Sequence, residues 1–232
     1  MRLTQSDRTS VEWPMRKQHP ELRRPRRPPL RVPVAVSPTH AHLTAASIEA
    51  LFCDHYRLHE HRRLGQPALY EAIETVTLIG PRGRLHKVPV IGPPRNANQV
   101  ELSSTDALRL GIAAPLRRSG QIVRTPGILI EGPRTSLRLK HGVIRALHHV
   151  HMTPGDAARV AVHDGEHVDA VIRVQRPLMF LRDVLVRVSP EFRLELHLDA
   201  DEANALGLKS GDQVELRKRS TSRAAASALA PR

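Results

Sequence analysis

A His-x-His motif that occurs twice constrains this chain more than any other feature of its sequence. His40-Ala41-His42 is followed 109 residues later by His149-Val150-His151. In a β-strand, residues i and i+2 point to the same face, so each motif predicts two imidazoles side by side on a rigid element. Neutral imidazole is a good ligand for zinc and neighbouring transition metals. The duplication therefore predicts two metal sites, or two halves of one site.

A wider repeat surrounds these motifs. In each of four segments a potential ligand is followed by an apolar residue, a helix-capping residue and a short helix: His42-Leu43-Thr44, Glu101-Leu102-Ser103, His151-Met152-Thr153 and His197-Leu198-Asp199. Three segments carry the capping-box pattern, in which an acidic residue three positions after the cap returns a hydrogen bond to it: Ser103 with Asp106, Thr153 with Asp156 and Asp199 with Glu202. The repeat predicts six candidate metal ligands at strand ends: His40, His42, Glu101, His149, His151 and His197.

The strand pattern predicts a mainly β fold with short capping helices. Short strands at regular spacing alternate with turns of Gly and Pro, which favours barrels over a doubly wound sheet. We expect two tandem, duplicated β-barrel domains with the active site between them, the first at 33–146 and the second at 147–217. The strand at 33–38 is a candidate for exchange into the second barrel. One continuous strand is expected over 144–151.

The net charge of +13 is concentrated at the two ends of the chain. Residues 1–32 carry +6 and many prolines, and residues 218–232 carry +4, which leaves +3 for 33–217. Proline interrupts helices and removes backbone donors, so we expect a disordered basic extension at the start and a flexible basic tail at the end. Aromatic residues make up only 3% of the chain, so stacking platforms are scarce and nucleic acid is not an expected partner.

Cysteine usage and hydropathy exclude further classes. The single cysteine, Cys53, rules out an intramolecular disulfide and a Cys-based zinc cluster. No segment approaches the roughly 20 apolar residues of a transmembrane helix, and the N-terminal segment has no apolar core of a secretory signal. The sequence therefore predicts no membrane partner and is compatible with a reducing cytoplasm.

Several ordered blocks carry a resemblance to a known family. They are Val34-x-Val36-Ser37-x-x-His40-x-His42-Leu43, Gly92-Pro93-x-Arg95-x-x-x-Gln99-Val100-Glu101, Leu139-Lys140-x-Gly142-Val143-Ile144, His149-x-His151-Met152, Val186-Arg187-Val188-Ser189-Pro190 and Glu195-x-His197-x-Asp199-x-Asp201-Glu202-Ala203-Asn204. Over about residues 33–216 the chain resembles the PduL-type phosphate acyltransferases (phosphate propanoyltransferases). The resemblance implies acyl transfer between coenzyme A and inorganic phosphate, two β-barrels capped by short helices, and two bound Zn²⁺ ions.

The resemblance also implies roles for individual residues. One zinc ion would be held by His40, His42 and Glu101. The other would be held by His149, His151 and His197. Arg95 would hold the phosphate, and coenzyme A would contact Ser37, Arg82, Ile91 and Asn204. Arg187 lies on the strand that precedes the one carrying His197, and it is a second candidate for phosphate because guanidinium groups bind phosphate oxygens bidentately.

Two features depart from the family's pattern. Arg124 stands before Thr125-Pro126-Gly127 where relatives tend to have glycine. Many relatives work inside bacterial microcompartments and carry an amphipathic N-terminal helix, whereas residues 1–32 have no clear 3.6-residue period. The sequence therefore leaves open cytoplasmic or microcompartment localisation, association with a microcompartment shell, and a homodimer.

The expected chemistry is direct attack of phosphate on the acyl-CoA thioester, without an acyl-enzyme. A zinc ion with three protein ligands keeps a fourth position open, which could take the coenzyme A sulfur. Cys53 is a rival nucleophile, but it and the nearby His55, His59 and His61 are interpreted as part of a polar helix end and loop. Two other functions stay open: a zinc-dependent, thioesterase-like hydrolase, and a non-catalytic scaffold protein whose metals are structural.

Overall fold

The computed structural model describes residues 29–173 and 178–219. Predictions for the N-terminal extension before residue 29 and for the tail after residue 219 lie outside these ranges. The helices of the described part are α1 (Ala45–Leu51), α2 (Ser104–Leu110), α3 (Pro154–Val160) and α4 (Ala200–Leu206). Its strands are β1 (Leu30–Ser37), β2 (His40–His42), β3 (Glu60–Arg63), β4 (Tyr70–Ile79), β5 (Arg84–Gly92), β6 (Gln99–Glu101), β7 (Leu116–Arg117), β8 (Ile128–Glu131), β9 (Ser136–Leu139), β10 (Val143–Ala146), β11 (His149–Met152), β12 (His167–Ile172), β13 (Met179–Val188), β14 (Glu195–Asp199) and β15 (Gln213–Lys218).

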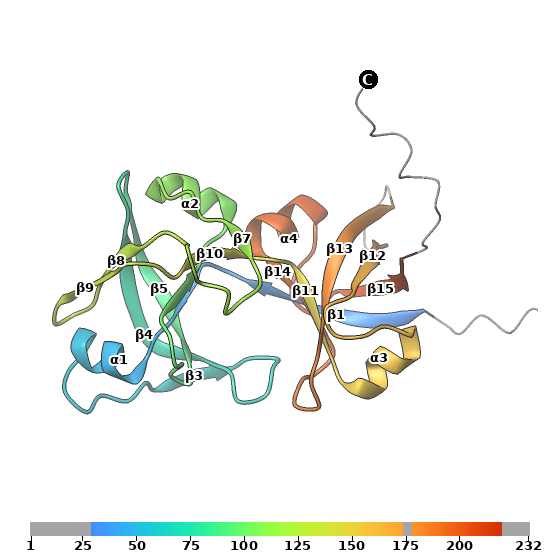
Figure 1. The fold of residues 1–232 in the computed structure, drawn as a ribbon, viewed down its shortest axis with the longest axis horizontal. Helices are drawn as coiled ribbons and strands as arrows, with labels where there is room; N and C mark the ends of the chain where they lie inside the picture. Colours follow the sequence, from blue (N-terminus) through green and yellow to red (C-terminus); the bar gives the residue numbers. More distant parts are fainter. Residues whose placement is uncertain (1–28, 174–177, 220–232) are drawn as a thin grey trace, which may run out of the picture.

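A closed barrel forms the C-terminal half of the molecule. Its strands follow the order β1-β14-β11-β13-β12-β15, and β1 closes it by pairing in parallel with β14 and antiparallel with β15. Apolar residues that alternate along these strands face inward, and Val150, Val186 and Leu196 are fully buried there. The first strand of the described chain therefore belongs to the barrel that the last strands build (Figure 1).

A nine-stranded sheet forms the other half. Eight of its strands follow the order β7-β10-β6-β2-β5-β4-β8-β9, and β3 pairs with β4 at one side. This sheet has a hydrophobic cluster of its own, separate from that of the barrel, with Leu78, Val100 and Ile130 fully buried. The two sheets lie side by side in Figure 1. The predicted fold class, mainly β with two barrel-like domains and short helices, is confirmed. The exact domain limits stay a prediction.

The chain crosses between the two halves at two points. Pro38 and Thr39 lie between β1 in the barrel and β2 in the sheet. Leu147 and His148 separate β10, which pairs with β6 and β7, from β11, which pairs with β13 and β14. The prediction of one strand over 144–151 is therefore wrong, because the two ends of that segment take partners in different sheets.

Each of the four helices begins at the capping residue that the repeat predicts. Thr44, Ser103, Thr153 and Asp199 all accept a hydrogen bond from the backbone N–H three residues later. Reciprocal capping boxes form at Thr153 and Asp199. The box predicted at Ser103 does not form, because the Thr39 hydroxyl lies between its two partners. Thr39 accepts from the Ser103 N–H at 3.1 Å and donates to Asp106 at 2.7 Å.

Two short strands were not predicted. All four residues of β3 are exposed, so the strand lacks the alternation of buried and exposed residues that marks a strand in a sequence. β7 has only two residues, both exposed. His59 precedes β3 and His61 lies on it, so the expected helix end and loop is partly an edge strand.

Candidate active site

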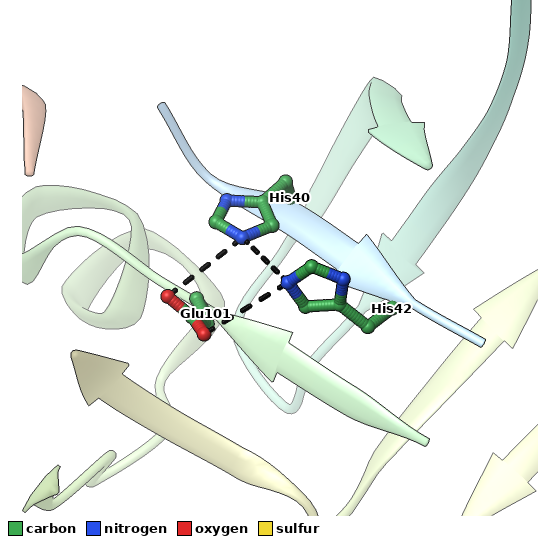
Figure 2. Close-up of side chains that lie close together, drawn as sticks. All are labelled: His40, His42 and Glu101. Carbon is green, nitrogen blue, oxygen red and sulfur yellow. Dashed lines mark hydrogen bonds and ion pairs between the residues drawn. The ribbon is translucent and has the colours of Figure 1, made fainter. Parts of the chain in front are cut away.

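Two antiparallel strands of the sheet build the first ligand group. β2 pairs with β6 so that His40 lies opposite Glu101, and Figure 2 shows His40, His42 and Glu101 turned toward one another. His40 Nε2 lies 3.7 Å from Glu101 Oε2, and His42 Nε2 lies 4.0 Å from Glu101 Oε1. The ligand atoms of the three residues all lie within 4.8 Å of one another.

The hydrogen bonds of the two imidazoles leave two lone pairs facing each other. His40 Nδ1 lies 2.8 Å from the carbonyl oxygen of Pro38, and His42 Nδ1 lies 3.3 Å from that of Ile91. A neutral imidazole that donates through Nδ1 has an acceptor at Nε2. The two Nε2 atoms are 3.1 Å apart, where two lone pairs repel unless a proton or a cation lies between them. Two nitrogen ligands of a tetrahedral zinc ion, each at about 2.0–2.1 Å, are about 3.3 Å apart. The spacing therefore fits a shared metal ion.

Glu101 is held as a carboxylate by its neighbours. Gln99 Nε2 and Ser119 Oγ donate to Glu101 Oε1 at 2.6 and 2.8 Å. Ser119 Oγ in turn accepts from Arg95 Nη1 at 3.5 Å. Burial alone would raise the pKa of Glu101, but the two adjacent imidazoles, the Ser119 hydrogen bond and Arg95 lower it to about 2. The charged form, which binds metal cations, is thus the form present at neutral pH.

The barrel repeats this arrangement with three histidines. β11 pairs with β14 so that His149 lies opposite His197, as His40 lies opposite Glu101. His149 Nδ1 lies 2.7 Å from the Leu147 carbonyl oxygen two residues earlier, as His40 does with Pro38. The ring centroids of His149, His151 and His197 are 4.6–5.0 Å apart. Within the described ranges, however, only the first group also brings its ligand atoms within 4.8 Å of one another.

Several buried polar atoms of this second group have no aligned hydrogen-bond partner. They are both ring nitrogens of His151, Nε2 of His197 and Nε of Arg187. Such atoms are costly unless something else satisfies them. Burial and nearby positive groups lower the pKa of His149 to about 3 and that of His151 to about 2, so both rings are neutral. The two unpaired nitrogens of the neutral, buried His151 ring fit a bound cation.

Two arginines stand beside the ligand groups. Arg187 is the neighbour of His151 in the parallel pairing of β11 with β13. Arg95 follows β5, and its backbone N–H donates to the Leu43 carbonyl oxygen at 2.8 Å. Burial lowers the pKa of both guanidinium groups, but both stay charged because the ordinary pKa of arginine is so high. Each ligand group thus has one positive group suited to an anion.

One cavity of about 350 Å³ joins the two ligand groups. Its walls include all six candidate ligands, both arginines, Ser37 and Ile91. These residues come from both the barrel and the sheet, so the cavity lies between the two halves. Arg82 and Asn204 do not line it; both are exposed, at the turn between β4 and β5 and on α4 respectively.

Four further side chains around the ligand groups were not predicted as site residues: Gln66, Gln99, Ser119 and Glu195. Gln99 and Glu195 each lie two positions before a candidate ligand on the same strand. The two-residue period of a strand could therefore have identified them. Gln66 and Ser119 lie in loops, where periodicity gives no signal.

Outside the cavity, the residues around Cys53 do not form a further ligand group among the described residues. Cys53 is exposed, and His59 Nδ1 lies 2.7 Å from the buried carboxylate of Glu74. As for membranes, no helix in the described part of the chain has the length and apolar character needed to cross one.

Known proteins are similar to this chain over most of its length. A family model for phosphate propanoyltransferase matches residues 33–209. A phosphate propanoyltransferase of Listeria monocytogenes is 44% identical over 188 residues, which is 81% of this chain and 88% of that protein. The enzyme of the same name from Thermotoga maritima is 45% identical over 181 residues, 78% of this chain and 86% of that protein. That of Salmonella typhimurium is 47% identical over 176 residues, 76% of this chain and 83% of that protein. The chain therefore belongs to the phosphate propanoyltransferase family of acyltransferases.

Proposed function

We propose that this protein is a phosphate acyltransferase that reversibly transfers a short acyl group between coenzyme A and inorganic phosphate. The observation that carries the proposal is the single cavity into which two ligand groups and two arginines converge. Membership of the phosphate propanoyltransferase family supports the same reaction. In this proposal the ligand groups would bind the thiolate and the arginines would bind the phosphate, which are the two groups that exchange the acyl chain.

The residues fit two Zn²⁺ ions, one held by His40, His42 and Glu101 and the other by His149, His151 and His197. The convergent nitrogen atoms of the first group and the two unpaired ring nitrogens of His151 in the second support this assignment. A bound zinc ion with three protein ligands and an open position would polarise the thioester and stabilise the departing thiolate.

Arg95 and Arg187 are the proposed phosphate-binding groups. A planar guanidinium group donates two parallel hydrogen bonds to a phosphate and so fixes its orientation. Arg95 is linked to Glu101 through Ser119, and Arg187 lies next to His151, so each arginine is adjacent to a different ligand group. An anion held between them would contact both halves of the molecule.

The proposed reaction is a direct displacement. A phosphate oxygen attacks the thioester carbonyl carbon, a C–O bond forms and the C–S bond breaks. The products are an acyl phosphate and coenzyme A, whose thiolate takes up the proton of hydrogen phosphate. No acyl-enzyme is needed, and Cys53 is exposed and is not among the residues that line the cavity.

Coenzyme A is a proposed ligand of the cavity. Ser37 and Ile91 line the cavity and support this proposal. Contacts to Arg82 and Asn204 stay predictions, as do a homodimer and localisation in the cytoplasm or a microcompartment lumen.

A thiol-release assay tests the proposal. Purified, metal-replete protein is mixed with propanoyl-CoA, and free thiol is followed with and without phosphate. We expect release that requires phosphate, that falls at least about 100-fold in Arg95→Ala because a positioned charge is lost, and that stops after chelation. The matched control is Arg138→Ala, at an exposed position of β9, which should leave the rate unchanged.

Other outcomes favour the other functions. Thiol release that does not need phosphate would indicate a thioesterase-like hydrolase. No release at all from protein that holds its metals would indicate a scaffold protein with structural metals. Retention of a labelled acyl group on the protein, lost in Cys53→Ala, would contradict direct displacement.

A further inference from the structure

A loop of the sheet half reaches across to the second ligand group. The loop at 64–69 joins β3 to β4 and carries Gln66, whose side chain is buried although it is polar. Gln66 Nε2 donates to the Arg193 carbonyl oxygen at 3.0 Å and to Glu195 Oε2 at 2.9 Å. Gln66 Oε1 accepts from the Arg193 N–H at 3.2 Å. One glutamine therefore binds both the backbone before β14 and a side chain on β14.

Gly65 of the same loop lies close to the Glu195 carboxylate. A β-carbon added at Gly65 would overlap Oε1, Oε2 and the carboxyl carbon of Glu195. No other residue type fits at Gly65 unless Glu195 moves. The Gln66 amide thus binds the Glu195 carboxylate, and the absence of a side chain at Gly65 leaves the space that the carboxylate occupies.

Glu195 lies beside two of the histidines of the second ligand group. It lies opposite His151 in the pairing of β11 with β14, and it precedes His197 by two residues on the same face. Its Oε2 lies 3.0 Å from His197 Nε2, which is within ion-pair distance although the two are not aligned as a hydrogen bond. Burial raises the pKa of Glu195, but His197, Gln66 and Arg193 together lower it below its ordinary value.

The first ligand group has a counterpart at the same position. Gln99 lies opposite His42 and two residues before Glu101, as Glu195 lies opposite His151 and two residues before His197. Gln99 is a donor next to a carboxylate ligand, and it binds that ligand at 2.6 Å. Glu195 is an acceptor next to an imidazole ligand. In both groups the residue two positions before the ligand has the hydrogen-bonding character opposite to that of the ligand.

We propose that Glu195, bound by Gln66 and accommodated by Gly65, is the positioning residue of the second metal site and orients the His197 ring. The loop at 64–69 would thereby let the sheet half set the geometry of a metal site in the barrel. This inference rests on the proposed function, because it requires a metal at the second group. Removing a residue that hydrogen-bonds to a metal-binding histidine typically lowers metal affinity by about 10- to 100-fold.

The test measures metal binding by the second group alone. His42→Ala disables the first group, so a chain with this substitution should hold one metal per chain where the unchanged protein holds two. Adding Glu195→Gln should weaken the remaining metal by about 10- to 100-fold in a chelator competition. Adding Gln66→Ala in place of Glu195→Gln changes neither a ligand nor Glu195 itself. It should also weaken binding of the remaining metal, by a smaller factor.

Glu215→Gln is the matched control. Glu215 lies on β15 of the same barrel, pairs with Arg173 and Arg217, and does not line the cavity. It should leave metal affinity unchanged. Cobalt substituted at the second group adds a readout that a merely structural role would not change. Its visible absorption spectrum should shift in Glu195→Gln and Gln66→Ala but not in Glu215→Gln.

The outcomes separate this inference from the proposed function. If the unchanged protein binds no metal, the metal assignment is wrong and the inference is overturned with it. If it binds two metals, and both Glu195→Gln and Gln66→Ala keep the original affinity and cobalt spectrum, only the inference is overturned. Circular dichroism identifies any variant that has lost its fold, and Gln66→Ala then decides the question.

Discussion

The Ser119 hydroxyl ties a proposed phosphate-binding arginine to a proposed metal ligand, and its removal is a sharp test of the first metal site. Ser119 Oγ donates to Glu101 Oε1 at 2.8 Å and accepts from Arg95 Nη1 at 3.5 Å. Ser119→Ala deletes both contacts, together with the 2.9 Å hydrogen bond that Gln99 Nε2 donates to Ser119 Oγ, and leaves all six candidate ligands in place. Any loss of metal must then come from the orientation and charge of Glu101.

The size of the effect follows from the contact that is lost. A hydrogen bond to a charged group contributes about 1.5–3 kcal/mol, and each 1.4 kcal/mol corresponds to about a tenfold change in an equilibrium constant. The full loss would weaken the first metal by about 10- to 100-fold. Gln99 Nε2 still donates to the same carboxylate oxygen at 2.6 Å, so we expect the lower end, about tenfold.

Chelator competition on Ser119→Ala measures this change. Of the two metals expected per chain, one should bind about tenfold more weakly and the other should be unchanged. Ser210→Ala is the control, because Ser210 also lines the cavity but, among the residues that the structure describes, its hydroxyl accepts only from the Val36 N–H. Unchanged affinity at both sites in Ser119→Ala, or an equal loss in Ser210→Ala, would refute the reasoning.

Further expectations concern pH, phosphate binding and the core. Metal-free protein should lose stability as the pH falls below 6.5, because unfolded His149 and His151 then bind protons that the folded state, with pKa values of about 3 and 2, does not. The free energy of unfolding, measured in urea, should fall by up to about 1.4 kcal/mol per pH unit for each of these two histidines. A free energy that stays constant from pH 7 to 5 would contradict this expectation. Arg95→Lys should raise KM for phosphate about tenfold without changing metal content, because an ammonium group makes no bidentate contact; steady-state kinetics with an unchanged KM would argue against the assignment. Leu196→Ala should lower the free energy of unfolding by about 2–5 kcal/mol, since Leu196 is fully buried in the barrel; a loss under about 1 kcal/mol in the same urea assay would show that the barrel core tolerates the cavity.

The repeat could be predicted from the sequence because its physics is local. Two histidines at i and i+2 share a strand face whatever lies around them, and a Ser, Thr or Asp before a helix caps it through its own side chain. Thr153 and Asp199 therefore behave as their sequences predict. Ser103 does not form its box, because Thr39 arrives from elsewhere in the chain, and a local pattern carries no information about such a partner.

The change of sheet within 144–151 could not be predicted for a similar reason. Ile144 and Val150 are both fully buried, so the apolar pattern looks like that of one strand. What ends β10 and starts β11 is the choice of pairing partner, which depends on strands far away in the sequence. The exposed strand β3 was missed because an edge strand without a buried face lacks the expected alternation.

The site shows the same division. The candidate ligands follow from strand spacing, and the structure brings all six to one cavity. Gln66 and Ser119 act from loops of the sheet half, and only the folded chain shows that they reach Glu195 and Glu101. The ten predicted residues in the cavity walls and the two outside them, Arg82 and Asn204, could not have been separated from the sequence alone.

The central claim is that phosphate itself takes the acyl group. Phosphorus-31 NMR of metal-replete protein with propanoyl-CoA and phosphate tests this most directly, with free thiol measured in the same sample. The account predicts one propanoyl phosphate for each thiol released. Thiol release accompanied by free propanoate and no acyl phosphate would contradict it.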